Sequence, residues 1–167
     1  SKLYAVNAVD GSPVKDFGTN GSIELKEGLD IPESQDGSLL LKTPGVIFKD
    51  LVILGMSLSE DADALPGHVR AFDVRTGKRK WIFHTIPQPG EFGYDSWEDK
   101  DAWKNIGGAN NWTGMSLDEE RGVVYVPTGT ASPDFYGGTR KGSNLFANSI
   151  IALDAETGKY IWHYQVV

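Results

Sequence analysis

A short motif that occurs twice constrains the fold of this chain more than any other feature of the sequence. Residues 71–81 read AFDVRTGKRKW and residues 152–162 read ALDAETGKYIW, so Ala, Asp, Thr, Gly, Lys and Trp recur at identical offsets. A weaker copy, AVNAVDG, starts at Ala5, with Phe17 near the place of the tryptophan. Regular repetition of a short unit is typical of propellers and solenoids, in which similar units stack on one another. The sequence therefore predicts a repeat array.

Each part of the motif suits a pair of antiparallel strands. The aspartate side chain can accept hydrogen bonds from the turn amides that follow it. Gly77 and Gly158 can adopt the positive φ that the turn requires. The tryptophan of the next strand, Trp81 or Trp162, can bury a large face between neighbouring units. The motif thus predicts hairpins joined by indole contacts.

Strand-like segments separated by Gly, Pro, Asn and Asp fill the rest of the chain, and sustained helical periodicity is hard to find. The expected class is all-β, a partial β-propeller with about two four-stranded antiparallel blades plus part of a third. Residues 37–85 are expected to form one blade and residues 109–167 another, with 1–36 as the remnant of a preceding blade and a linker. The strands of the first blade are expected around residues 39–43, 46–48, 51–55 and 68–84.

Residues 86–108 are interpreted as an excursion between the blades, because the stretch is too long for a plain turn. Its tryptophans, Trp97 and Trp103, either pack over the blade edge or shape a substrate entrance, and packing is favoured. Propellers close with about four to eight blades, so these units cannot close a ring. The isolated chain is expected to expose blade faces or to associate with itself, which light scattering would detect.

Composition excludes several classes of function. The chain has 23 acidic and 16 basic residues, a formal charge of −7 and no Lys/Arg cluster, so binding to nucleic acid is not expected. It has no cysteine, which excludes disulfides, thiolate metal sites and a cysteine nucleophile. Its apolar runs are too short to span a bilayer. Its three histidines lack metal-ligand spacing.

Three further segments accompany the repeats: GGANNW at residues 107–112, VPTGTASPD at 126–134 and NLFANS at 144–149. With the repeated tryptophan docking motif, they resemble the pyrroloquinoline quinone (PQQ)-dependent dehydrogenases, most closely the glucose dehydrogenase-like branch. The resemblance implies that the chain is a segment of an eight-bladed propeller. It also implies a quinone lying flat near the propeller axis, stacked on a tryptophan, with calcium or magnesium at its carbonyl oxygens.

On this resemblance, Trp112 takes the place of the stacking tryptophan. The alternative is that Trp112 only packs between blades, although it lies outside the repeat positions. Ser57 and Thr43 match positions that hydrogen-bond the quinone, and their alternative is ordinary turn chemistry.

Glu60 lies where the family places a metal-binding glutamate, and a loop carboxylate suits a hard cation. The alignment needs a two-residue shift before Asp73, so Asp61 or Asp63 could be the ligand instead, and a solvated acidic loop is the other interpretation. Thr130 stands where the alcohol-oxidising members have a metal-binding Asn. Either water takes that ligand position or the metal site is of the sugar-oxidising type.

The resemblance implies a periplasmic oxidoreductase that oxidises an aldose or an alcohol and passes electrons to a membrane quinone or a cytochrome. Such an enzyme is either free or attached to the membrane through regions outside this segment. The catalytic aspartate is expected after Val167, so no catalytic residue is assigned here and the isolated segment is expected to be inactive. The alternative is a non-catalytic propeller that scaffolds protein–protein interactions, like the outer-membrane assembly propellers. The scaffold predicts Trp112 buried far from Glu60, whereas the enzyme predicts both at one end of the blades.

Overall fold

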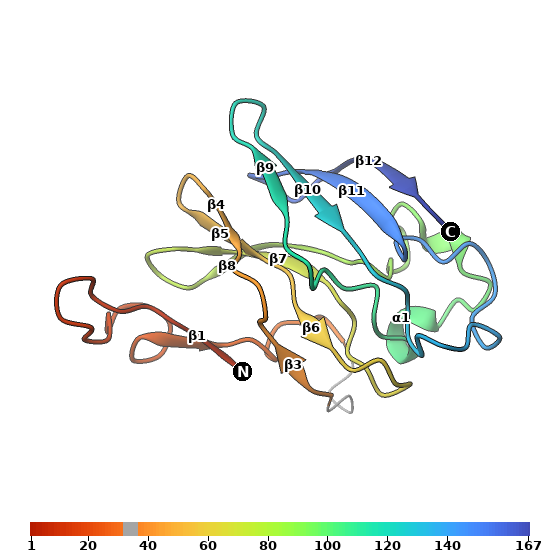
Figure 1. The fold of residues 1–167 in the computed structure, drawn as a ribbon, viewed down its shortest axis with the longest axis horizontal. Coiled ribbons are helices and arrows are strands. Elements are labelled where there is room, and N and C mark those ends of the chain that lie inside the picture. Colours follow the sequence, from red (N-terminus) through yellow and green to blue (C-terminus); the bar gives the residue numbers. More distant parts are fainter. Residues whose placement is uncertain (32–36) are drawn as a thin grey trace.

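A computed structural model describes residues 1–31 and 37–167, and its regular secondary structure is almost entirely antiparallel sheet (Figure 1). Two four-stranded sheets dominate, and the strands of each are hydrogen-bonded in chain order. The first contains β4 (Val46–Phe48), β5 (Leu51–Leu54), β7 (Val69–Asp73) and β8 (Arg79–Phe83). The second contains β9 (Ser116–Asp118), β10 (Val123–Pro127), β11 (Ser149–Asp154) and β12 (Tyr160–Gln165).

Two short strand pairs and two short helices complete the described part of the chain. The pairs are β1 (Lys2–Tyr4) with β2 (Ser22–Glu24), and β3 (Leu39–Leu40) with β6 (Ser57–Leu58). The helices are η1 (Tyr94–Ser96) and α1 (Ala102–Asn105). No helix within residues 1–31 and 37–167 is long and apolar enough to span a bilayer.

The predicted all-β partial propeller, with two four-stranded blades and part of a third, is confirmed. The predicted strand at residues 39–43 is wrong, because the strand there ends at Leu40 and pairs with β6 outside the blade. Pro44 lacks an N–H for a continuing ladder, which separates β3 from β4. The fourth blade strand comes instead from residues 68–84, which form two strands rather than one. Residues 32–36 of the predicted linker lie outside the described part.

The repeated motif forms the same turn in both blades. Asp73 Oδ1 accepts hydrogen bonds from the Thr76 N–H at 2.9 Å and the Arg75 N–H at 3.0 Å. Asp154 Oδ1 likewise accepts the Thr157 N–H at 2.8 Å. The turn glycines, Gly77 and Gly158, have φ values of 72° and 71°. The side-chain chemistry predicted from the motif therefore ends β7 and β11 and starts the strands that follow.

These hydrogen bonds make the turn sensitive to acid. Hydrogen bonds to its carboxylate lower the pKa of Asp73 to about 2. The largest effect comes from the Thr76 N–H, followed by the Thr76 hydroxyl and the Arg75 N–H. Because the pKa is lower in the folded state than the ordinary value of about 3.9, the stabilisation is complete above pH 4 and lost as pH falls towards 2. We expect the urea midpoint of Asp73→Asn to vary less with pH between 5 and 2 than that of the wild type. Parallel curves for the two proteins would contradict this role.

An aromatic ring of each of the first two units packs on the turn of the next unit. Trp81 of β8 is buried, with 7% of its surface exposed, and its Nε1–H donates to the Ala155 carbonyl of the second blade at 3.2 Å. A Cβ at Gly158 would lie 2.5 Å from the Trp81 ring, so the contact requires glycine there. The indole thus joins one blade to the next.

Phe17 occupies the corresponding place one unit earlier. A Cβ at Gly77 would lie 3.2 Å from Phe17 Cζ, and the Gly18 N–H donates to the Thr76 carbonyl at 2.9 Å. Trp162 has no following unit in this chain and is 44% exposed. Its packing between blades stays a prediction.

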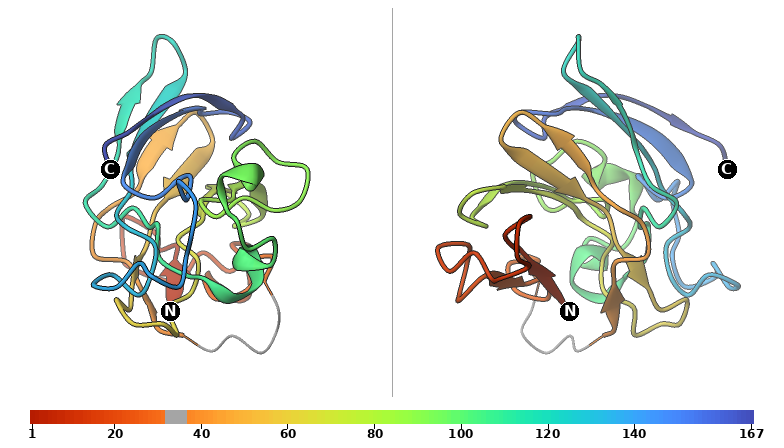
Figure 2. Two further views of the ribbon diagram at one scale, coloured as in Figure 1. Left: turned by 90° about the vertical axis from the view of Figure 1, so that its right-hand side faces the viewer. Right: turned by 60° about the vertical axis from the view of Figure 1, so that its left-hand side comes forward.

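The main core lies between the two four-stranded sheets, which face each other in Figure 2. It is made of apolar residues from both: Phe48, Leu51, Ile53, Val69, Ala71, Trp81, Val124, Val126, Phe146, Ile151, Leu153 and Ala155. A separate cluster forms under the excursion, where Trp97 is buried and its Nε1–H donates to the Leu145 carbonyl at 2.6 Å. Trp103 packs against this cluster, so both aromatics pack among the connections that flank the blades, and the choice between packing and a substrate entrance stays a prediction.

Candidate functional site

The connections that carry the predicted site residues gather at one end of the two blades. The β5–β7 connection (residues 55–68) and the β10–β11 connection (128–148) both leave this end, opposite the β4–β5 and β9–β10 hairpins (Figures 1 and 2). The segment 107–112 runs between them, because Gly108 bridges to Pro66 on one side and to Ala131 on the other. One backbone segment therefore joins the loops of both blades.

The backbone before Trp112 is held firmly on both sides. The Met56 N–H donates to the Asn111 carbonyl at 2.9 Å, and Asn110 Nδ2 donates to the Met56 carbonyl at 2.9 Å. On the side of the second blade, Asn111 Nδ2 donates to the Pro127 carbonyl at 2.7 Å, and the Gly129 N–H donates to the Asn110 carbonyl at 3.0 Å. The segment is therefore a fixed support for the residue that follows it.

Trp112 itself is 55% exposed rather than buried between the sheets. Its indole lies beside Gly129, since a Cβ at that glycine would be 3.5 Å from Trp112 Nε1. A large aromatic ring on a rigid backbone costs little conformational entropy to order, and its open face can stack on a flat ligand. The arrangement presents an aromatic platform at this end of the blades.

Ser57 and Thr43 lie at the same end. Ser57 is buried in β6, where it is paired with Leu40. Thr43 lies in the bend between Leu40 and Val46, and Val46 is paired with Ile53 near the end of β5. Ser57 directly follows Met56, which holds Asn110 and Asn111, and the roles of Ser57 and Thr43 towards the quinone stay predictions.

Glu60 and Thr130 come from different blades, and the β10–β11 connection brings them to one region. The Asp134 N–H donates to the Glu60 carbonyl at 2.9 Å, and the Ala109 N–H donates to the Thr130 carbonyl at 2.7 Å. Arg140 Nη2 donates to Thr130 Oγ1 at 3.2 Å. Partial burial, with the negative charge of Glu60, raises the pKa of Asp134, and the charge of Arg140 opposes that rise.

The alternatives to Glu60 differ in their surroundings. Ser59 Oγ accepts the Asp61 N–H at 3.1 Å and donates to Asp63 Oδ1 at 3.3 Å, so the side chain of Asp63 bonds within its own loop. Glu60 instead joins Asp134 across the blades. This bond places the backbone of Glu60 at the shared region, and the choice among Glu60, Asp61 and Asp63 as the metal ligand stays a prediction.

The donor set suits PQQ and forms only part of a metal site. An exposed indole with nearby hydroxyls fits a flat, oxygen-rich ring system. The carboxylate of Glu60 and the hydroxyl of Thr130 are the donor type that calcium or magnesium prefers. Within the described ranges, however, no group of three or more His, Asp or Glu side chains could hold a metal ion.

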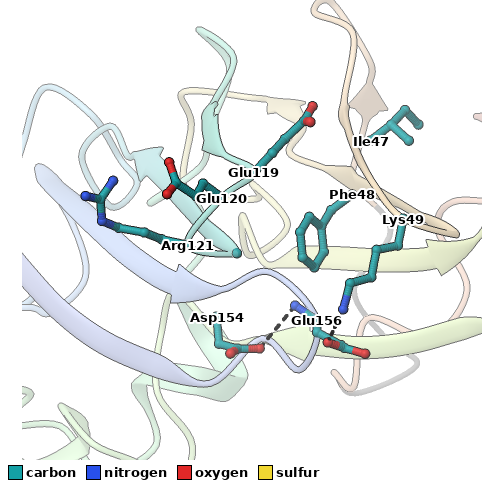
Figure 3. Close-up of a pocket in the computed structure, with 9 residues that line it drawn as sticks. Ile47, Phe48, Lys49, Glu119, Glu120, Arg121, Asp154 and Glu156 are labelled. Carbon is teal, nitrogen blue, oxygen red and sulfur yellow. Dashed lines mark hydrogen bonds and ion pairs between the residues drawn. The ribbon is translucent and has the colours of Figure 1, made fainter.

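A cavity of about 600 Å³ lies at the opposite end, between the β4–β5 and β9–β10 hairpins (Figure 3). Phe48 and Lys49 line one side, and Lys49 Nζ pairs with Glu156 Oε2 at 2.7 Å. Its walls are strand-end and turn residues, and none of the predicted site residues lines it. It is therefore a gap between blade edges rather than part of the site.

Sequence reasoning missed Asp134 and Arg140 as members of this region. Asp134 ends the segment VPTGTASPD, so its position directly after a strand end and a Pro was an available signal. Arg140 had no such signal, because only the folded connection brings it to Thr130.

Sheets that follow one another in chain order, with an aromatic ring of one packed on the turn of the next, define a partial β-propeller. The chain belongs to the PQQ family described as "Glucose/ethanol/alcohol dehydrogenase, beta-propeller domain", which it matches over residues 1–167.

Named relatives agree with this membership. The chain is 34% identical over 98% of its length to quinoprotein glucose dehydrogenase A of Acinetobacter calcoaceticus, and 34% over 99% to the quinate/shikimate dehydrogenase (quinone) of Acinetobacter baylyi. It covers 20% of each of these relatives, so it spans about a fifth of their length. The crystal structure of quinohemoprotein alcohol dehydrogenase from Comamonas testosteroni is similar over 98% of this chain and 24% of that one, with 31% identity and a TM-score of 0.78.

Proposed function

We propose that this chain forms part of the cofactor-binding end of a PQQ-dependent dehydrogenase that oxidises an aldose sugar or an alcohol. One observation carries the proposal: Trp112 presents an open indole face on a rigid backbone, at the end of the blades where Glu60 and Thr130 also lie. The named relatives, which act on glucose, on quinate or shikimate and on alcohol, support it. A scaffold propeller would instead have Trp112 buried.

The residues have distinct roles in this proposal. Trp112 stacks on the quinone, while Ser57, Thr43 and Thr130 supply hydroxyls for its oxygen atoms. Glu60 contributes a carboxylate to calcium or magnesium, whose remaining ligands come from elsewhere. When bound, PQQ would supply a hydride acceptor for the substrate's carbinol carbon, and the substrate's hydroxyl proton would pass to a base, so that a carbonyl product forms. No residue of this chain is assigned as that base, so the segment by itself is proposed to be inactive.

Location and electron acceptor follow from the resemblance alone. We propose a periplasmic enzyme, attached to the membrane through other regions if at all, that passes electrons to a membrane quinone or a cytochrome. The absence of cysteine is compatible with an oxidising compartment.

Reconstitution tests the proposed function. The complete protein, freed of quinone and metal, is expected to oxidise glucose or simple alcohols with a dye acceptor only after PQQ and calcium are added. Omitting either component provides the control. Turnover in protein shown to contain no quinone would defeat the proposal, as would failure to bind PQQ at all.

A further inference from the structure

An exposed loop projects from the same end of the blades as Trp112. Residues 133–139 read PDFYGGT, and within them Phe135 is 90% exposed and Tyr136 is 64% exposed. The base of the loop is fixed, because the Arg140 N–H donates to the Gly137 carbonyl at 3.1 Å and the Asp134 N–H donates to the Glu60 carbonyl at 2.9 Å. Two aromatic rings are therefore exposed in this chain, beside a residue whose backbone is bonded to Glu60 of the proposed site.

The Asp134 carboxylate beside these rings has unused hydrogen-bonding capacity. It is partly buried, and none of the residues that the structure describes donates a hydrogen bond to it or forms an ion pair with it within 4 Å. The guanidinium of Arg140 is instead bonded to Thr130 Oγ1, the Pro133 carbonyl and Asn144 Oδ1. A partly desolvated carboxylate is an acceptor with two oxygens, and O–H donors from a ligand would satisfy both.

A partly buried carboxylate beside exposed aromatic rings matches the surface of a polyhydroxylated molecule. Neighbouring hydroxyls can each donate to one carboxylate oxygen, and charged hydrogen bonds of this kind are stronger than neutral ones. Aromatic rings offer apolar faces to the C–H groups of the same molecule. A monohydric alcohol has no second hydroxyl to donate once its reacting hydroxyl is placed at the quinone.

We propose that Asp134 is a specificity-determining residue that binds a second hydroxyl of the substrate, so that polyhydroxylated substrates are selected over monohydric alcohols, with Phe135 and Tyr136 flanking it as an apolar surface. The inference rests on the proposed function. It adds a role for Asp134 in the choice between these two kinds of substrate.

Two three-carbon substrates separate the effect of the extra hydroxyls from that of size. The complete protein, loaded with PQQ and calcium, is assayed with glycerol and with 1-propanol. Asp134→Ala is expected to lower kcat/KM for glycerol by about 10- to 100-fold, mostly through KM, the size of loss typical of a hydrogen bond to a charged group. The value for 1-propanol should change by less than about threefold, and Asp134→Asn, which keeps one acceptor, should be intermediate.

Controls distinguish recognition from structural damage. Glu120→Gln removes a carboxylate from the β9–β10 hairpin at the opposite end and should leave both substrates unaffected. Quinone content, measured from its absorbance, and calcium affinity should be unchanged in Asp134→Ala. An equal fall for both substrates, or a parallel loss of calcium affinity, would show that Asp134 supports the metal or the fold and would overturn the inference.

The substrate preference of the wild-type protein is an independent test of the inference. A preference for 1-propanol over glycerol would overturn the inference and leave the proposed function intact. Absence of both quinone binding and turnover would instead refute the proposed function, and the inference with it.

Discussion

Trp81→Ala is expected to lower the free energy of unfolding of this chain by about 3–5 kcal/mol, the cost typical of removing a buried large aromatic side chain. Trp81 is 7% exposed, belongs to the core between the two sheets and donates its Nε1–H to the Ala155 carbonyl. Its removal would leave a cavity over the Gly158 turn and an acceptor without its donor. Urea denaturation followed by circular dichroism measures the loss.

Trp162→Ala is the matched control, because it changes the same motif position in the next blade. Trp162 is 44% exposed, so the expected loss is about 1 kcal/mol or less. Trp81→Phe should lie between the two, since it keeps an apolar ring and loses the hydrogen bond. Equal losses for Trp81→Ala and Trp162→Ala would contradict the joining role of Trp81 between blades.

Trp112→Ala is expected to weaken PQQ binding to the complete protein by about 10- to 100-fold, the range that follows from losing roughly 1.5–3 kcal/mol of ring burial and stacking. Titration of the quinone-free protein with PQQ, followed by tryptophan fluorescence, gives the Kd. The melting temperature of the quinone-free variant should stay close to that of the wild type, because the ring is 55% exposed.

Trp112→Phe tests whether an aromatic face is what the cofactor needs. We expect it to recover most of the affinity, because a smaller ring still stacks. If Trp112→Ala instead bound PQQ with normal affinity and unfolded at a lower temperature than the wild type, Trp112 would be a packing residue.

The sequence predicted the parts of this fold that local chemistry determines. The Asp-Thr-Gly turn fixes its own geometry through bonds between near neighbours, so two copies of the motif were enough to place the hairpins that end in Trp81 and Trp162. The prediction of a blade strand at 39–43 was wrong because the length of a strand depends on its distant partner rather than on local chemistry. Leu40 pairs with Ser57 and not with a strand of the blade.

The candidate site likewise contains residues that the sequence predicted and residues that only the folded structure brings together. Trp112 and Glu60 came from resemblance at single positions, and the structure places both at one end of the blades. Asp134 and Arg140 become neighbours of Glu60 and Thr130 only through the path of the β10–β11 connection. Contacts between residues of different blades depend on how the two sheets pack, so they cannot be predicted from residue spacing within one segment of the sequence.

The most direct test of the central claim is a crystal structure of the complete protein with PQQ bound. We predict that the quinone stacks on the open face of Trp112, with Glu60 directed towards its metal ion and the loop 133–139 beside the substrate space. A quinone bound elsewhere, with Trp112 covered by a neighbouring blade, would contradict the account.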